Sequence, residues 1–324
     1  MEQGYTYTPK MLSDASEVSS PTALPTPVIT QSSTEKYIVW HIQGGLGKNI
    51  AATSLISSLK ETYPDRKLIM IVSYPEAFLN NSFIDRVYQL GQSPYFFQDY
   101  IENKDTIIFR HEPYHQTGHI NMTKHLIENW CDLLGLEYKN QQPKIFLNFV
   151  QQQLLGTWTR EKPVMAIQTC GGPGEADSLS YSWARDMPQP IAQTIVDKYK
   201  DQYHIIQITR QSGYELTGVE RFDKKISNIE LFAILGVAKK LVLIDSCLQH
   251  AAAAFNIKAT VLWVGTSPTV FGYSLHNNIK AQIPKIANQL IGSYLFDYQF
   301  ENNVHECPYI DLKDFFTPDQ INNI

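Results

Sequence analysis

The chain has 324 residues, of which 43% are hydrophobic and 18% charged, a composition typical of a globular protein and unlike a disordered or fibrous one. Its length predicts two domains of about 150 residues each, because one hydrophobic core seldom serves so long a chain. The formal net charge of -5 argues against a broad basic surface for nucleic acid, although it leaves room for a local basic cleft.

Residues 1–34 are rich in serine, threonine and proline and lack apolar periodicity, so we expect a flexible tail there. The chain has neither the pattern of a signal peptide nor a run of about 18 apolar residues that would span a membrane. The four cysteines have no CxxC spacing, which disfavours a zinc site or a disulfide framework and favours reduced thiols. We therefore expect a cytoplasmic protein without a transmembrane segment.

After the tail, short apolar runs alternate with amphipathic stretches. This pattern predicts strands at 37–42, 67–73, 83–90 and 105–110 and helices at 49–60 and 119–134. Such alternation is typical of a parallel sheet that helices cover on both faces.

The alternation restarts after a link at about 144–162, which predicts a second α/β unit. We expect strands at 163–169, 203–209, 240–245 and 258–264, helices at 190–200, 228–238 and 248–255, and a short helix at 318–323. Residues after about 285 are less regular, and we expect them to form closing helices. The predicted organisation is a tail (1–34), an N-terminal Rossmann-like domain (35–155) and a C-terminal Rossmann-like domain (156–324).

A glycine-rich turn follows the first strand, at Gly44, Gly45 and Gly47, and Lys48 stands at the start of the next helix. Glycines let the backbone approach a ligand closely, and the helix start suits an anion. The spacing matches neither GxGxxG nor a Walker A loop, which disfavours a dehydrogenase or a kinase. The alternative is a tight turn with a solvated lysine.

A second polar cluster follows the strand at 240–245, where Asp245 and Ser246 precede a helix that carries His250 one turn later. Ligands of open α/β sheets bind at the carboxyl ends of strands, and Ser246 is placed to begin a phosphate-binding helix. Loops at 169–174 and 265–269 also follow strands, so three polar or glycine-rich loops share one rim. The alternative for the helix start is simple capping with a buried histidine.

Four segments resemble, in order and spacing, segments of glycosyltransferase family 9, the ADP-heptose:lipopolysaccharide heptosyltransferases. They are Leu216–Gly218, Asn228–Ala233, Leu243–Ala252 and Gly265–Pro268, and Gly45–Asn49 resembles the first turn of that family. The resemblance implies an α/β GT-B fold, in which two Rossmann-like domains face each other across a cleft. It also implies an enzyme that moves a sugar from a nucleotide-diphosphate sugar to a glycan or lipid-linked glycan, with inversion.

The resemblance also implies roles for individual residues. Ser246 and Gln249 would meet the diphosphate, and Asp245 would orient the sugar or its loop. Thr169 and Arg185 would balance the charge of the leaving group, and an arginine fork suits a diphosphate. The full set of expected donor-site residues is Gly45, Gly47, Thr169, Arg185, Asp245, Ser246, Gln249, His250 and Thr266.

One position departs from the family pattern, because Lys48 stands where the family has an aspartate that is thought to act as the base. A protonated lysine is not a base unless burial depresses its pKa well below normal. Either Lys48 holds phosphate or the base comes from elsewhere, and His111 or Glu112 at the end of the fourth strand are the candidates. The alternative is that 111–115 is an ordinary polar loop. The expected catalytic residues are Lys48, His111, Glu112 and Arg185.

The chain has no Asp-x-Asp metal pair, so we expect no metal and no cofactor beyond the nucleotide-sugar donor. Two other functions stay open at this point. One is transfer to a modified base in nucleic acid, as some phage enzymes do, and the mildly acidic balance argues weakly against it. The other is a catalytically inactive relative that only binds a nucleotide sugar.

Overall fold

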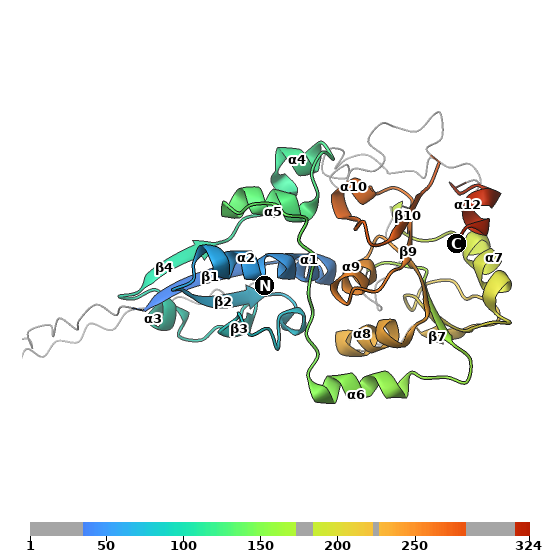
Figure 1. Ribbon diagram of the computed structural model, residues 1–324, viewed down its shortest axis with the longest axis horizontal. Helices are drawn as coiled ribbons and strands as arrows, with labels where there is room; N and C mark the ends of the chain where they lie inside the picture. Colours follow the sequence, from blue (N-terminus) through green and yellow to red (C-terminus); the bar gives the residue numbers. More distant parts are fainter. Residues whose placement is uncertain (1–34, 173–183, 223–226, 283–314) are drawn as a thin grey trace, which may run out of the picture.

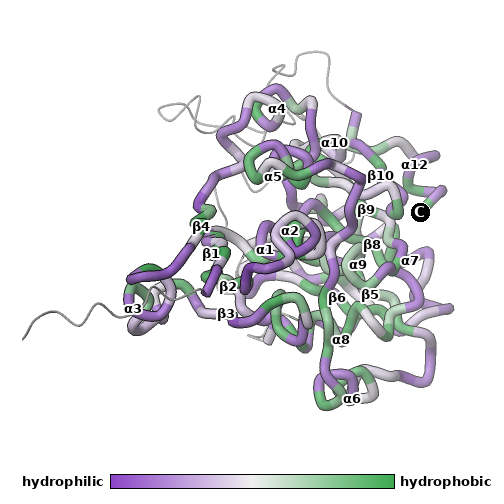
Figure 2. The backbone as a smooth tube through the Cα atoms, turned by 60° about the vertical axis from the view of Figure 1, so that its left-hand side comes forward, coloured by the Kyte–Doolittle hydropathy of each residue, from purple (hydrophilic) through white to green (hydrophobic). Residues whose placement is uncertain are grey.

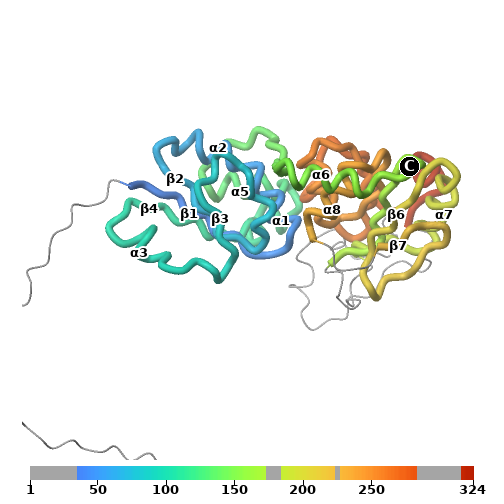
Figure 3. Tube along the Cα trace, turned by 90° about the horizontal axis from the view of Figure 1, so that it is seen from below, coloured from blue at the N-terminus to red at the C-terminus, as the bar shows by residue number. Residues whose placement is uncertain are grey.

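The computed structural model describes residues 35–172, 184–222, 227–282 and 315–324, which form two α/β lobes that lie side by side (Figures 1 and 3). The front lobe comprises the elements from β1 to α5, and the rear lobe those from α6 to α12. Within the described residues, no helix is long and apolar enough to cross a membrane. The predicted tail at 1–34 and most of the segment after 285 lie outside the described residues.

The front lobe contains a four-stranded sheet in the order β3-β2-β1-β4, with all neighbours parallel. β1 and β2 carry nearly continuous apolar runs because both of their faces are covered. The strands are β1 (Lys36–Ile42), β2 (Lys67–Val72), β3 (Arg86–Gln89) and β4 (Asp105–Phe109). The helices are α1 (Leu46–Ala52), α2 (Ile56–Thr62), α3 (Phe96–Tyr100), α4 (Thr117–Ile120) and α5 (Leu126–Leu134).

The rear lobe contains a six-stranded parallel sheet in the order β10-β9-β8-β5-β6-β7. Counted within this sheet, the order corresponds to the doubly wound pattern 3-2-1-4-5-6. The strands are β5 (Val164–Gln168), β6 (His204–Ile208), β7 (Glu220–Phe222), β8 (Lys240–Ile244), β9 (Thr260–Trp263) and β10 (Asn277–Lys280). The helices are α6 (Phe149–Thr157), α7 (Gln189–Tyr199), α8 (Asn228–Val237), α9 (Cys247–Ala254), α10 (Pro268–Phe271) and α12 (Pro318–Asn322).

The predicted alternation of strands and helices is confirmed, and the largest error concerns the helix expected at 119–134. It is two helices, α4 and α5, because the backbone turns between them. Met122 has a positive φ of 54°, and the His125 ring accepts a hydrogen bond from the Ile127 amide at 3.2 Å, which starts α5 anew. α6 lies in the stretch that was expected to be a link. None of its residues is fully buried, so its sequence shows no clear apolar stripe from which a helix could be predicted.

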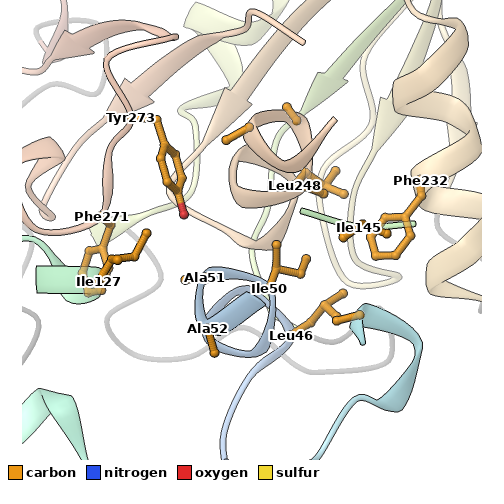
Figure 4. Packing of buried hydrophobic residues seen from close by; sticks show 14 of the residues in the cluster. Leu46, Ile50, Ala51, Ala52, Ile127, Ile145, Phe232, Leu248, Phe271 and Tyr273 are labelled. Atoms are coloured by element: carbon orange, nitrogen blue, oxygen red, sulfur yellow. The ribbon is translucent and has the colours of Figure 1, made fainter. Parts of the chain in front are cut away.

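The two lobes share one hydrophobic core, which joins Trp40 of β1 to Ala166 of β5. Figure 4 shows Leu46 and Ile50 of α1 facing Leu248 of α9 across this junction. Hydrophobic stretches concentrate on the central strands and α8, and hydrophilic ones on the outer connections (Figure 2). A hydrogen bond from the Asn228 amide to the Glu76 carboxylate also links the lobes.

The two lobes approach each other closely at Gly47, where α1 crosses α9. A Cβ added to Gly47 would lie 2.8 Å from His250 Cδ2 and 3.3 Å from the Cα of Cys247. Real Cβ atoms do not approach neighbouring atoms this closely, so only glycine permits the observed crossing.

We expect Gly47→Ala to destabilise the protein by about 1–3 kcal/mol, because the new methyl group must push α9 away from α1. The net loss is expected although alanine favours helices over glycine by about 1 kcal/mol. Gly156→Ala in α6 is the control, since a Cβ there meets nothing within 4 Å. Urea denaturation of both variants measures the effect, and equal stability of the two would show that the crossing is not tight.

Candidate active site

A cavity of about 490 Å³ lies between the lobes, at the carboxyl ends of both sheets. The front lobe contributes the glycine-rich turn after β1, together with Tyr74 after β2 and Tyr114 after β4. The rear lobe contributes residues that follow β5, β6 and β8, among them Cys170, Thr209 and Ser246. Each sheet therefore presents to the cavity the edge at which α/β proteins bind ligands.

The strand order of the rear sheet reverses between β5 and β8, and this switch point opens directly into the cavity. Gln168 and Cys170 line it from the end of β5, and Asp245 and Ser246 from the end of β8. Ser246 begins α9 without a side-chain cap. The first amides of α9 are thus left for another acceptor, and the helix dipole favours an anion there.

The glycine-rich turn is held in shape by Asn49. Its buried side-chain amide donates to the carbonyl of Gly44 at 3.2 Å and to that of Gly45 at 2.9 Å. Gly44 has a φ of 109°, which only glycine adopts readily, and its missing side chain leaves space for the stem of Lys48. The turn is therefore rigid, and Gly44 to Lys48 all line the cavity.

Lys48 is an almost fully buried cation, with its side chain 5% exposed. Its Nζ lies 2.5 Å from a carboxylate oxygen of Glu112 and 4.8 Å from the centre of the Tyr114 ring. Burial lowers the pKa of Lys48, and the Glu112 carboxylate opposes that shift. Lys48 lines the cavity and Glu112 does not, so Glu112 holds the ammonium from outside the cavity.

Arg185 and Asp245 form the second charged pair of the cavity. Arg185 Nε lies 3.5 Å from Asp245 Oδ2, and the Asp245 side chain is nearly fully buried. Both residues line the cavity, and they come from different loops of the rear lobe. The carboxylate therefore orients a guanidinium whose planar fork suits a phosphate or carboxylate ligand.

His250 lines the cavity without adding charge. Its Nδ1 lies 2.8 Å from the Tyr273 hydroxyl, and its Nε2 lies 3.1 Å from the side-chain nitrogen of Gln249. Burial lowers the pKa of His250 to about 3, and the neighbouring His125, His276 and Arg185 lower it further in the same direction. The ring is neutral at pH 7 and serves as part of the wall against Gly47.

Seven of the residues that the sequence predicts for the site line this one cavity. They are Gly45, Gly47, Lys48, Arg185, Asp245, Ser246 and His250. Five others lie beside it and are not among its lining residues: His111, Glu112, Thr169, Gln249 and Thr266.

The buried members of the second group make contacts within the rear lobe. Thr169 accepts a hydrogen bond from Gln207 at 3.0 Å, and Gln249 donates to the carbonyl of Phe271 at 3.0 Å. Thr266 is also buried, whereas His111 is exposed on the loop after β4. Thr169 and Gln249 therefore bond to other residues of the rear lobe, behind the cavity lining.

An ion pair that the sequence patterns did not predict joins two loops of the rim. The Arg210 guanidinium pairs with Asp186 and donates to the carbonyl of Gly171 at 2.8 Å, and the Gly171 amide donates to Asp186 at 3.0 Å. Burial raises the pKa of Asp186. This network ties the loop after β5 to the segment that carries Arg185. Arg210 follows the carboxyl end of β6, and this position in the sequence could have indicated it as a residue of the rim.

Tyr74, Tyr114 and Phe222 were also missed, and they supply aromatic wall to the cavity. Tyr74 and Tyr114 follow strand ends of the front sheet, as the polar candidates do. Among the described residues, no group of three or more His, Cys, Asp and Glu side chains could hold a metal ion.

Comparison with known proteins finds similarity in structure but not in sequence. No protein-family model and no curated protein matches this chain. A glycosyl transferase of family 9 from Veillonella parvula matches with a TM-score of 0.58 and 12% identity, over 90% of this chain and 97% of that one. The E. coli ADP-heptose LPS heptosyltransferase II matches with a TM-score of 0.57 and 10% identity, over 79% and 93%.

A third similar structure is TibC, a dodecameric iron-containing glycosyltransferase of enterotoxigenic E. coli. Its TM-score is 0.62 at 14% identity, over 90% of this chain and 76% of that one. At these identities the similarity establishes the fold. The predicted α/β architecture of two Rossmann-like lobes is confirmed, and the folds that it resembles include family 9, as the motifs indicated.

The buried histidines around the cavity predict how stability depends on pH. Burial lowers the pKa of His119 and of His125 to about 4, well below the value of about 6.5 in an unfolded chain. Between about pH 6.5 and 4 the unfolded chain therefore binds protons that the folded one does not, so the free energy of unfolding falls as the pH falls. Each such histidine contributes up to about 1.4 kcal/mol per pH unit.

Urea denaturation at several pH values measures this slope. His119→Phe should reduce it, because phenylalanine keeps the ring contacts with Tyr114 and Phe271 and does not titrate. His111→Gln, at an exposed site, should leave it unchanged. A free energy of unfolding that stays constant from pH 7 to pH 5 would contradict the burial of these rings.

Proposed function

We propose that this protein is a glycosyltransferase that moves a sugar from a nucleotide-diphosphate sugar to a glycan or lipid-linked glycan. One observation carries the proposal: the cavity at the switch point of the rear sheet brings the uncapped start of α9 together with Arg185 and Lys48. A helix start and two cations suit a diphosphate. In fold the chain is similar to TibC, whose structure was solved in complex with ADP-D-β-D-heptose, and to E. coli WaaC, solved with ADP.

The rear lobe would hold the donor. The amides at the start of α9, next to Ser246, would donate to the diphosphate, and Asp245 would hold the Arg185 fork against it. When the bond between the anomeric carbon and the phosphate oxygen breaks, negative charge grows on the diphosphate. Donors and cations that are already in place stabilise this charge best. They also balance it without calling for a metal ion.

Lys48 would complete the donor site from the front lobe. α1 touches α9 at Gly47, so the next residue of α1 stands close to the amides that begin α9. The ammonium is held in place by Glu112 and by the Tyr114 ring. A cation fixed in this way would attract the departing diphosphate, and it also explains why an aspartate is not needed at this position.

The acceptor would enter from the front lobe, beside Tyr74 and Tyr114, and its hydroxyl would attack the anomeric carbon from the face opposite the diphosphate. This direction of attack inverts the anomeric centre. Glu112 lies behind this side of the cavity, paired with Lys48, and we assign it the acceptor proton, which it would reach once the Lys48 ammonium has turned toward the diphosphate. His111 is the weaker candidate because it is exposed, and its ring lies against Phe109.

Donor binding is tested with a thermal-shift panel of nucleoside diphosphates and nucleotide sugars. At about 100 times its Kd a ligand raises stability by about 2.7 kcal/mol, so at least one member should raise the Tm clearly. Arg185→Ala should remove the shift, whereas Arg86→Ala, at an exposed site on β3, should keep it. No shift with any member would remove the donor site from the proposal.

The roles of Lys48 and Glu112 are separable by experiment. Lys48→Met should lower kcat by roughly 10²–10³-fold and should also weaken binding of the nucleoside diphosphate. Glu112→Gln should lower kcat by roughly 10²-fold or more and largely keep that binding, because the glutamine oxygen can still accept a hydrogen bond from the Lys48 ammonium but cannot take a proton. Lys258→Met, at an exposed site, should change neither. Loss of diphosphate affinity in Glu112→Gln would mean that Glu112 only orients Lys48.

A further inference from the structure

Large apolar side chains are exposed on two neighbouring segments, the loop between β2 and β3 and the start of α6. Among the described residues, Leu79, Phe83, Phe146, Phe149 and Val150 are all exposed, with Phe149 and Val150 at 74% and 69%. The first two lie in the loop between β2 and β3, and the other three lie at the start of α6 or just before it. We refer to these five residues as the apolar patch.

Hydrogen bonds join the two parts of the patch. The side chain of Asn80 donates to the carbonyl of Phe146 at 3.0 Å and to the Gln151 side chain at 3.2 Å. The capping box between Asn148 and Gln151 fixes the first turn of α6. The patch is therefore one ordered surface that bridges the front loop and α6.

The fold does not need Phe149 and Val150 to be apolar. α6 runs beside α8 (Figures 1 and 3), and its contact with that helix is made by Leu155, whose Cδ2 lies 2.5 Å from where a Cβ of Gly236 would be. Phe149 and Val150 stand at the other end of α6 and face solvent. A group of large apolar side chains exposed together often marks an interaction site.

The charges around the patch indicate what kind of partner fits. The stretches 77–84 and 145–159 contain no Asp, Glu, Lys or Arg, and the residues that border them carry both signs: Glu76, Asp85, Arg86, Lys144 and Arg160. Two copies of an acidic protein repel each other least where neither copy carries charge. The cores of protein interfaces are depleted in charged residues and enriched in aromatic ones. An anionic membrane surface would instead attract lysine and arginine, which these stretches lack.

We propose that the apolar patch is the interface between two copies of this chain. A twofold interface places the same surface on both partners, and an uncharged apolar surface is complementary to itself. None of the five patch residues lines the cavity, so the interface would not use the residues of the candidate active site. The partner copy would pack against both the front loop and α6 of one copy. It would thereby stabilise the contact between that loop and α6. This inference is independent of the proposed enzymatic activity.

The test is the oligomeric state of the full chain, measured by sedimentation equilibrium over a range of concentrations. The wild type should be a dimer, and Phe149→Asp should raise the dimer Kd by at least tenfold, because two buried carboxylates would face an apolar partner surface. Phe97→Asp is the matched control, since Phe97 is an aromatic residue on α3 that is 57% exposed and lies outside the patch. It should leave the dimer intact.

Val150→Glu serves as a second variant, and an unchanged Tm shows that each variant is folded. A wild type that is monomeric at every concentration, or a dimer that survives both substitutions in the patch, would overturn the proposal. Co-sedimentation with phosphatidylcholine vesicles, with and without phosphatidylserine, provides the other arm. Vesicle binding by a monomeric wild type that Phe149→Asp abolishes would assign the patch to a membrane instead.

Discussion

The arrangement of this protein depends on the contact between α1 and α9 at Gly47. The absence of a side chain there allows two helix starts, one from each lobe, to meet at the cavity. A single hydrophobic core then continues from one sheet into the other. Residues of both lobes line the cavity, and neither sheet alone encloses a site. The proposed catalysis therefore requires the two lobes to be arranged as they are here.

Charge inside the cavity is organised by burial. The Lys48 side chain is nearly fully buried. A buried cation is stable only with a partner, which Glu112 provides. Arg185 is partly exposed, and there the buried partner is the carboxylate of Asp245, 3.5 Å from Arg185 Nε. His250, which also lines the cavity, is kept neutral by burial, so it adds no third positive charge to the two cations. The cavity thus offers paired cations and helix amides, a combination that suits an oxyanion more than a neutral ligand.

Lys48 stands where the resemblance to family 9 implies an aspartate, and a cation there is consistent with this distribution of charge. An acid would add negative charge to the cavity and would favour a cationic or neutral group. Under the proposed function, a lysine adds to the attraction for phosphate, and the acceptor proton would go to another residue. Glu112 is 64 positions away in sequence, and only the pairing of β1 with β4 brings its loop to Lys48.

The sequence alone determined the parallel α/β architecture, because the period of the apolar residues differs between buried strands and amphipathic helices. It also located much of the cavity, since the carboxyl-end rule applies to any parallel sheet and selected Gly45, Lys48, Asp245 and Ser246. Tertiary structure alone decided which side chains at those ends face the cavity. Thr169 and Gln249 form hydrogen bonds inside the rear lobe, with the Gln207 side chain and the Phe271 carbonyl. α6 packs against α8 although it has no apolar stripe of its own. The physical reason is that side-chain direction and lobe contact depend on partners far away in the chain, and local patterns carry no record of those partners.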